Sequence, residues 1–225
     1  MGNNCNLYID EDDTYINKED FDNQIVSTKE SLVAQTKDEV KLLIFPDGSY
    51  YKGLVNVNKP EGQGKLTRKD GSSHEGEWKN GLPHGYGSAT YSNGNTYSGF
   101  FDQGKRQGTN GKYVCKEFTY VGEWKNGKMN GQGSIELKSG EKYNGDFSDN
   151  NFDGQGVLTY KSGKYYSGYF KEGQRNGKGK IVLTDGGIYE GNFLKGVPTK
   201  DGVYKNKEGI SSVTEWKDGV LVLTN

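Results

Sequence analysis

The sequence predicts an all-β protein, an elongated and twisted array of consecutive antiparallel β-hairpins that follows an acidic N-terminal arm. Its 225 residues include 35 glycines and 16 tyrosines; 31% are hydrophobic and 12% aromatic. A low hydrophobic fraction alone is typical of disorder, but disordered chains are poor in aromatic residues. Beyond residue 50, a pattern of Tyr, Gly and Trp or Phe recurs every 23 residues, which indicates a repeat protein.

Charge and glycine divide the chain into an arm and a body. Residues 1–40 contain ten acidic residues and three lysines, a net charge of −7, whereas the remaining residues sum to +6. We expect residues 1–27 to be a flexible acidic arm. For residues 28–39 we expect either a short capping helix, because Ser27-Thr28-Lys29-Glu30 fits a capping box, or a linker. The repeat array then covers residues 40–225.

The body contains seven full frames of 23 residues, which begin at a Tyr or, in the second frame, at His74. An incomplete frame flanks the array on each side. The full frames are 51–73, 74–96, 97–119, 120–142, 143–165, 166–188 and 189–211, and the half frames are 40–50 and 212–225.

Each frame predicts one hairpin. Position 1 is Tyr or His, position 3 is Gly and position 5 is Trp, Phe or Val, so these three residues share one face of a strand. We expect a turn that contains the glycines at positions 8 and 12, a second strand that begins at the glycine at position 14, and a second turn around position 21. The glycines at positions 3 and 14 leave room for the rings. One hairpin buries too little to fold alone, so the frames must stack.

Stacking brings the aromatic side chains of all frames onto one face of the sheet. We expect this aromatic face to pack the hairpins together, and we expect either this face or the hairpin loops to bind partners. The members of the aromatic face are Tyr51, Trp78, Tyr97, Phe101, Tyr120, Trp124, Tyr143, Phe147, Tyr166, Phe170, Tyr189, Phe193 and Trp216.

Several frames depart from the pattern. In the first, Val55 and Asn58 replace the aromatic residue and the glycine at position 8. In the third, Asn110 takes the place of the glycine at position 14 and Gly111 follows, so we predict a bulge, with one residue more in the hairpin loop and one fewer in the next turn. In the seventh, Lys200 replaces the glycine at position 12, as expected of a terminal repeat. We expect residues 212–225 to form a closing hairpin.

Basic residues are expected at the tips of the hairpin loops, at Lys105, Arg106, Lys128, Arg175 and Lys178. Such positions are usually solvated, and a lipid site would need a denser cluster of charge. They leave open an attraction to anionic lipid or to an acidic partner. The body is too weakly basic for nucleic-acid binding.

No constellation in the sequence predicts an enzyme. His74 and His84 occupy ordinary repeat positions, and the recurrent Gly-x-Gly pairs lack the third glycine and the helix of a dinucleotide site. Two cysteines cannot form a disulfide framework and favour a reducing, cytoplasmic location. The chain has no run of 18 apolar residues for a membrane span and no secretory signal. We therefore expect no catalytic residue, metal, cofactor or small-molecule substrate.

The first residues suggest lipidation. Gly2 follows Met1, as N-myristoylation requires, and Cys5 lies where a palmitoyl chain is often added, although position 6 is Asn rather than Ser or Thr. Two acyl chains give stable membrane anchoring where one is marginal. The alternative interpretation is a polar tail without lipid.

The repeated motif resembles the MORN (membrane occupation and recognition nexus) repeat family. The segments EGEWKNG at 75–81 and GEWKNG at 122–127 match its pattern almost letter for letter, and the resemblance covers residues 51–211 in full. It implies a non-catalytic scaffold for protein partners or self-association, in some members beside a membrane. The alternatives that it implies are a cytoskeletal or axonemal component similar to ciliary radial spokes, and a membrane-tethered module that binds anionic lipid.

Overall fold

The computed structural model describes residues 27–28, 39–199, 202–217 and 220–224. All regular secondary structure in these residues is β-strand and none of it is helix, which confirms the predicted all-β class. The strands belong to two compact units. The first contains the described part of residues 9–116 together with 123–127, and the second contains residues 117–122 and the described part of 128–225.

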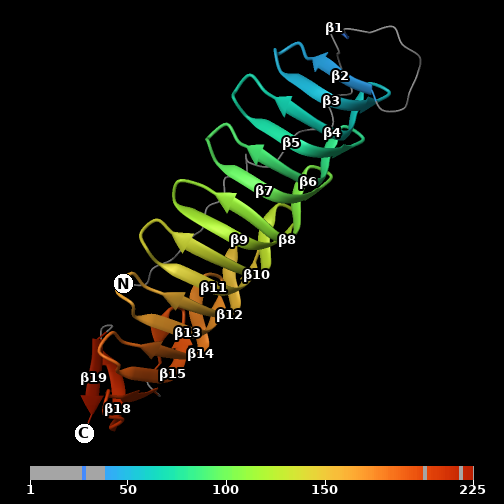
Figure 1. The fold of residues 1–225 in the computed structure, drawn as a ribbon. Coiled ribbons are helices and arrows are strands. Elements are labelled where there is room, and N and C mark those ends of the chain that lie inside the picture. The colour runs from blue at the N-terminus through green and yellow to red at the C-terminus, as the bar shows by residue number, and fades with distance from the viewer. Residues whose placement is uncertain (1–26, 29–38, 200–201, 218–219, 225) are drawn as a thin grey trace. The chain divides into compact units, whose positions relative to one another are not determined.

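In the first unit, antiparallel strands follow one another in chain order (Figure 1). Each strand pairs with the next from β1 to β8. The strands are β1 (Ser27–Thr28), β2 (Glu39–Ile44), β3 (Tyr50–Asn56), β4 (Lys59–Thr67), β5 (Ser73–Lys79), β6 (Leu82–Thr90), β7 (Thr96–Asp102) and β8 (Lys105–Val114).

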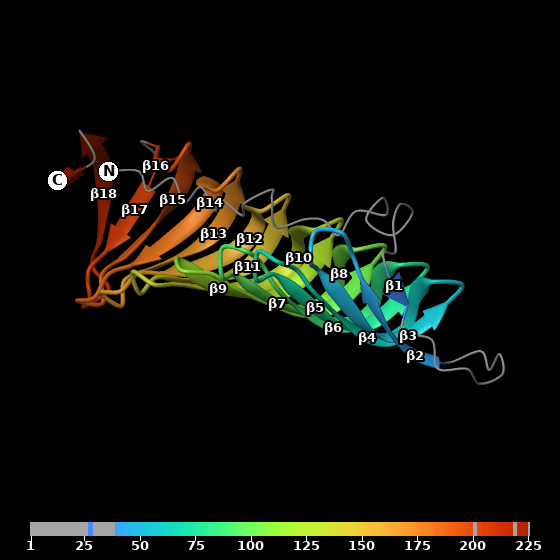
Figure 2. The ribbon, with the colours of Figure 1, turned by 90° about the horizontal axis from the view of Figure 1, so that it is seen from above.

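The second unit has the same order, and Figure 2 shows its strands β12 to β15 side by side. Strand β9 (Phe118–Lys125) supplies residues to both units. The other strands are β10 (Lys128–Leu137), β11 (Lys142–Ser148), β12 (Asn151–Thr159), β13 (Tyr165–Lys171), β14 (Gln174–Val182), β15 (Ile188–Leu194), β16 (Val197–Pro198), β17 (Gly202–Lys205), β18 (Ser211–Lys217) and β19 (Val220–Thr224).

In each of the seven full frames, a two-residue turn at positions 7 and 8 joins the strands of the hairpin. Between β5 and β6 it consists of Asn80, with φ 52°, and Gly81, with φ 81°. Two successive residues with positive φ form a type I′ turn, whose twist matches that of the paired strands. The hairpin prediction is confirmed, but its loop is shorter than expected. Because this turn needs only two residues, β6 begins at position 9, and Gly85 at position 12 lies inside the strand.

Each hairpin bends beside its glycines. In the second frame, Gly76 opposes Gly87, and the register then shifts so that Trp78 opposes Pro83. Three residues of β6 therefore face the single residue Glu77, which is a β-bulge, and bulges bend the strand that contains them.

The glycines make room for the rings, as the sequence predicts. In the fifth frame, a Cβ built on Gly156 would lie 2.3 Å from the hydroxyl oxygen of Tyr143 and 2.4 Å from its Cε2 atom. Gly145 opposes Gly156 in the register, and a Cβ there would lie 2.7 Å from the same hydroxyl. The Tyr143 ring therefore covers a pair of residues that cannot have side chains.

Edge-to-face contacts between rings connect successive frames. In the second unit, the ring centroid of Tyr143 lies 5.2 Å from that of Phe147 in its own frame and 5.1 Å from that of Phe170 in the next. Tyr166 repeats the arrangement with Phe170, at 5.1 Å, and with Phe193, at 4.9 Å. Such pairs contribute roughly 0.5–1.5 kcal/mol beyond the area they bury. Each frame is thus completed by a ring from the frame 23 residues later.

The third frame contains the predicted bulge and the predicted short turn. Tyr97 pairs with Tyr113, one residue further along the chain than in the regular frames, and Asn110 has φ 60°. The following turn spans only 115–117, against 91–95 one frame earlier. The sequence predicts the extra residue in the hairpin loop, but the structure has it within β8. The loop stays at two residues because the I′ turn is already complete.

The end units also differ from the regular frames. In the seventh, the second strand is divided into β16 and β17, which both pair with β15. The predicted closing hairpin is present as β18 and β19. Ser27 and Thr28 form β1 against Ile44 and Leu43. The rest of the predicted arm and capping segment, residues 1–26 and 29–38, lies outside the described residues.

Candidate interaction surface

The aromatic face predicted for partners is the core of the sheet. Twelve of its thirteen members are 4% exposed or less, so the expectation that partners bind these rings is wrong. The bend of each hairpin brings the rings of positions 1 and 5 against one another and removes them from solvent. The remaining member, Trp216, lies in β18. The twelve are Tyr51, Trp78, Tyr97, Phe101, Tyr120, Trp124, Tyr143, Phe147, Tyr166, Phe170, Tyr189 and Phe193.

Four of the buried tyrosines at position 1 donate their hydroxyl groups to a carbonyl oxygen of the same frame three residues later. The hydroxyl of Tyr143 donates a hydrogen bond to the carbonyl oxygen of Asp146 at 2.9 Å, and that of Tyr166 donates to Tyr169 at 3.0 Å. Tyr51 and Tyr97 do the same. Burial raises the pKa of Tyr166 to about 12. These hydroxyls therefore stay neutral and structural.

His74 occupies the tyrosine position of the second frame. Its ring is buried edge-on to Trp78, at 5.0 Å, and to Phe101, at 4.6 Å. Neither ring nitrogen has a hydrogen-bond partner in the described part of the chain, and burial lowers the pKa of His74 to about 4. The prediction that it is a repeat position is confirmed. His84 lies in β6 rather than in a turn, with Nδ1 3.2 Å from Asp102 Oδ1.

The sequence predicts Arg106 at a loop tip, and this prediction is wrong. The residue lies in the core. It is buried as the second residue of β8, and its Nη2 atom donates to the carbonyl oxygen of Gly127 at 2.9 Å. The guanidinium carbon lies 4.6 Å from the ring centroid of Trp124 and 5.1 Å from that of Tyr113. Arginine reaches this position because the two-residue turn leaves position 10 inside the strand, where its planar group stacks on the rings.

The other four predicted basic residues also differ in where their side chains lie, over core rings, beside a turn or on the outer face. Arg175 is half-buried over the rings of Tyr166 and Phe193. Lys105 and Lys128 are the first residues of their strands, and Lys128 Nζ lies 3.7 Å from Asp149 Oδ1. Lys178 lies in β14 and is exposed. Of the five, it is Lys178 that takes part in a recessed surface.

The face opposite the aromatic core, called the outer face below, bears the side chains of frame positions 2, 4, 13 and 15. Tyr86, at position 13, is 66% exposed there, and Tyr169, at position 4, is 47% exposed. Tyr86 packs edge-to-face on Phe100 with centroids 5.5 Å apart, and Phe100 also contacts His84.

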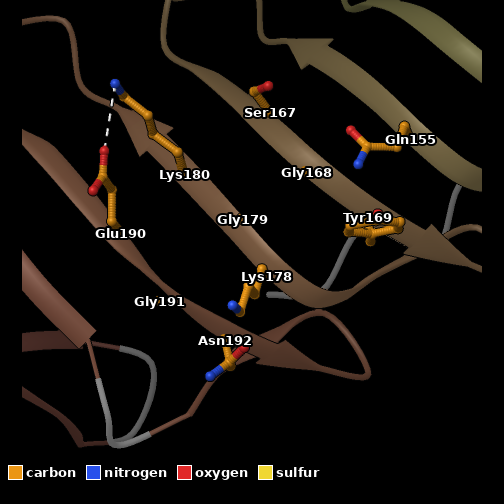
Figure 3. Close-up of a pocket in the computed structure, with 10 residues that line it drawn as sticks. All are labelled: Gln155, Ser167, Gly168, Tyr169, Lys178, Gly179, Lys180, Glu190, Gly191 and Asn192. Carbon is orange, nitrogen blue, oxygen red and sulfur yellow. Dashed lines mark ion pairs between the residues drawn. The ribbon is translucent and has the colours of Figure 1, made fainter.

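A hollow of about 520 Å³ opens on the outer face across β12 to β15 (Figure 3). Three glycines line it, with side chains on both sides of them. Lys180 forms an ion pair with Glu190, Nζ to Oε1 3.5 Å. The lining residues are Gln155, Ser167, Gly168, Tyr169, Lys178, Gly179, Lys180, Glu190, Gly191 and Asn192.

This hollow offers ammonium, carboxylate, amide and phenol groups for binding. Within the described ranges, no three His, Cys, Asp or Glu side chains lie close enough to hold a metal ion. Nor does any helix there have the length and apolarity to cross a membrane.

Sequence reasoning named only Lys178 among the residues of the hollow. The missed residues occupy positions 2, 4, 13 and 15, which vary from frame to frame and so give no periodic signal. The signal that could have found them is the strand alternation itself, because residues between the conserved ring and glycine positions must point to the other face.

Comparison with protein families places five segments of the chain, just over half of it, in one family. The model described as MORN repeat matches residues 51–73, 74–96, 120–142, 143–165 and 166–188. The third and seventh frames, which are the two with irregular second strands, are not among them. A search of curated proteins gave no match.

Comparison with solved structures gave distant likenesses. The SAS-4 (dCPAP) TCP domain of Drosophila melanogaster, in complex with a proline-rich motif of Ana2 (dSTIL), has 10% identity and a TM-score of 0.33, covering 84% of this chain and 98% of that one. The wild-type TCP10 domain of Danio rerio CPAP has 13% identity and a TM-score of 0.25, covering 81% and 97%. Likenesses this low do not bear on function. From the family match and the 23-residue hairpin frame, the chain belongs to the MORN-repeat family.

Proposed function

We propose that the chain is a non-catalytic scaffold that holds protein partners on the outer face of its sheet. The observation that supports this is the contrast between the two faces. The core positions are nearly all Tyr, Trp or Phe, whereas position 4 on the outer face takes six residue types over the seven frames. It is Leu54, Glu77, Phe100, Glu123, Asp146, Tyr169 and Asn192 in successive frames. A common backbone with a different side chain in each repeat is how repeat proteins build specific binding surfaces.

The exposed tyrosines support the same proposal. Tyr86 and Tyr169 present large rings with a polar tip to solvent on the outer face. Tyrosine is enriched in protein interfaces and among the residues that dominate their binding energy. The core rings cannot take this role because they are buried.

Proximity labelling from the full chain in its native cells tests the proposal. We expect the double variant Tyr86→Ser, Tyr169→Ser to lose a defined set of labelled proteins that the wild type retains. Val57→Ser is the matched control, since Val57 is 89% exposed but lies in a hairpin turn. An unchanged set of labelled proteins in the double variant would show that partners bind elsewhere.

Location remains a separate hypothesis. Gly2 and Cys5 lie outside the described residues, so the lipid tether stays a prediction. If the arm is acylated, we expect the chain in the membrane fraction and Gly2→Ala in the soluble fraction. A cytoskeletal or axonemal component would instead remain in the detergent-insoluble fraction with either residue at position 2.

A further inference from the structure

We propose that the hollow across β12 to β15 binds a carboxylate side chain from an acidic segment of a partner protein, with Lys178 as its counter-ion. This inference rests on the proposed scaffold function and gives the partner's chemistry at one place on the outer face. Other frames of the same chain indicate what that place accommodates.

Position 4 is an acid in the second, fourth and fifth frames, and in the second and fifth its carboxylate contacts position 13, which in the sixth frame is the lining residue Lys178. In the second, Glu77 Oε1 accepts a hydrogen bond from the main-chain N–H of Tyr86 at 3.3 Å. In the fifth, Asp146 Oδ2 accepts from the N–H of Gln155 at 2.7 Å. A Cβ on the position-12 glycine would lie 2.4 Å from the carboxylate of Glu77 and 2.6 Å from that of Asp146. Position 4 thus lays a carboxylate over the position-12 glycine and against the N–H of position 13.

The sixth frame leaves this place open. Its position 4 is Tyr169, and apart from chain neighbours the Cβ of Tyr169, at 3.7 Å, is the sole heavy atom of the described residues within 4 Å of a Cβ built on Gly177. In the first and third frames, Leu54 and Phe100 cover the equivalent glycine at 2.9 and 3.4 Å. The sixth frame therefore lacks the side chain that fills the position in four other frames.

The sixth frame also adds a positive charge beside the open place. Position 13 is uncharged in each of the first five frames, and in the sixth it is Lys178. Lys178 is exposed and forms no ion pair with any residue that the structure describes, whereas Lys180 on the same hollow is paired with Glu190. A carboxylate that enters would replace the missing internal one and would gain a charge-assisted hydrogen bond.

The remaining lining suits a peptide around that carboxylate. The amides of Gln155 and Asn192 can hydrogen-bond to a peptide main chain, and the exposed ring of Tyr169 offers apolar contact. The lining has two lysines and one glutamate, so its charge complements an acidic segment.

Fluorescence anisotropy with the full chain tests this assignment. The probe is a fluorescein-labelled eight-residue peptide of Gly and Ser with two central aspartates, and the control peptide has two asparagines instead. We expect the aspartate peptide to bind, and Lys178→Gln to weaken it about three- to tenfold. Lys112→Gln removes a lysine that is also exposed, on the outer face of β8, and should leave binding unchanged. Equal binding of the two peptides, or equal effects of the two substitutions, would overturn the assignment.

A second variant supplies the carboxylate internally. Tyr169→Glu should place an acid where Glu77 and Asp146 have theirs, and we expect it to abolish peptide binding while the thermal midpoint stays close to that of wild type. Tyr169→Phe keeps the ring and should still bind. Wild-type affinity in Tyr169→Glu would refute the carboxylate site. If the peptide fails but outer-face variants still lose labelled partners, the scaffold function stands and this assignment alone is wrong.

Discussion

The first position of each frame has to fill the core and also to satisfy its own polar atoms. Tyrosine does both, since its ring covers the glycine pair and its hydroxyl donates to the carbonyl oxygen at position 4. His74 fills the space but leaves two nitrogens without partners in the described structure. A buried polar group without a partner costs about 1–3 kcal/mol. The second frame therefore contains a local defect that a single substitution can repair.

We predict that His74→Tyr stabilises the protein by about 1–2 kcal/mol, because it exchanges the orphaned nitrogens for a bonded hydroxyl. Thermal unfolding should show the midpoint raised by several degrees. The reverse change one frame later, Tyr97→His, is the matched control and should lower it. A lower midpoint for His74→Tyr would mean that the second frame has adapted to the smaller ring.

The same histidine gives a pH dependence. The pKa of His74 in the folded protein, about 4, lies below the ordinary value of 6.5. Between these two pH values the histidine is protonated in the unfolded chain but not in the folded one. Stability from this residue is complete above pH 6.5 and is lost as the pH falls toward 4. At pH 5 the loss is about 2 kcal/mol. We expect denaturant unfolding at pH 7.5 and pH 5 to show a smaller loss for His74→Tyr than for wild type. Equal losses would exclude His74 as the source.

At the scale of the hairpin, the bend depends on glycine at positions 3 and 14. We predict that Gly156→Ala destabilises the protein by about 2–3 kcal/mol, since its Cβ would meet the Tyr143 ring at 2.3–2.4 Å. Urea unfolding measures the change. Val157→Ala, on the next residue of the same strand but on the outer face, should change stability by less than about 0.5 kcal/mol. A tolerated Gly156→Ala would show that the ring can move aside.

The hairpins could be predicted from the sequence because rings, glycines and turn residues repeat with one period. The length of the hairpin loop could not, because Gly85 at position 12 resembles a turn glycine, yet it serves a bulge inside β6. Arg106 was assigned to a loop for the same reason. The charge of Arg106 predicts a solvated side chain. The sequence alone does not indicate that the Trp124 ring and the carbonyl oxygen of Gly127 surround its guanidinium group.

The candidate site was less predictable than the fold. Lys178 was recognised as basic, but its importance comes from Tyr169, nine residues earlier, which lacks the carboxylate that other frames have at that position. Tyr169 at position 4 becomes informative only when the structure shows that the carboxylate of Asp146, at the same position one frame earlier, contacts the main-chain N–H of position 13.

For the whole molecule, the frame contacts imply that stability is a sum of repeats and of the interfaces between them. The registers of β10 with β11 and of β12 with β13 are the same, with Gly131 opposite Phe147 and Gly154 opposite Phe170. The rings repeat as well, since Tyr120 meets Phe147 as Tyr143 meets Phe170. One frame should therefore be removable with the Tyr–Phe contact and the strand register kept at the new junction.

We predict that deletion of residues 143–165 leaves a folded β protein of lower stability, in which Tyr120 packs on Phe170. Far-ultraviolet circular dichroism should keep the β signal per residue, and urea unfolding should show a lower midpoint and a slope reduced by roughly a tenth, in proportion to the surface removed. Deletion of 143–154 is the control. It joins the end of one hairpin to the middle of the next second strand, which breaks the register and exchanges the two faces. If both deletions unfold the chain, the stability does not reside in exchangeable 23-residue frames; if only the second does, the frame read from the sequence is also the unit of folding.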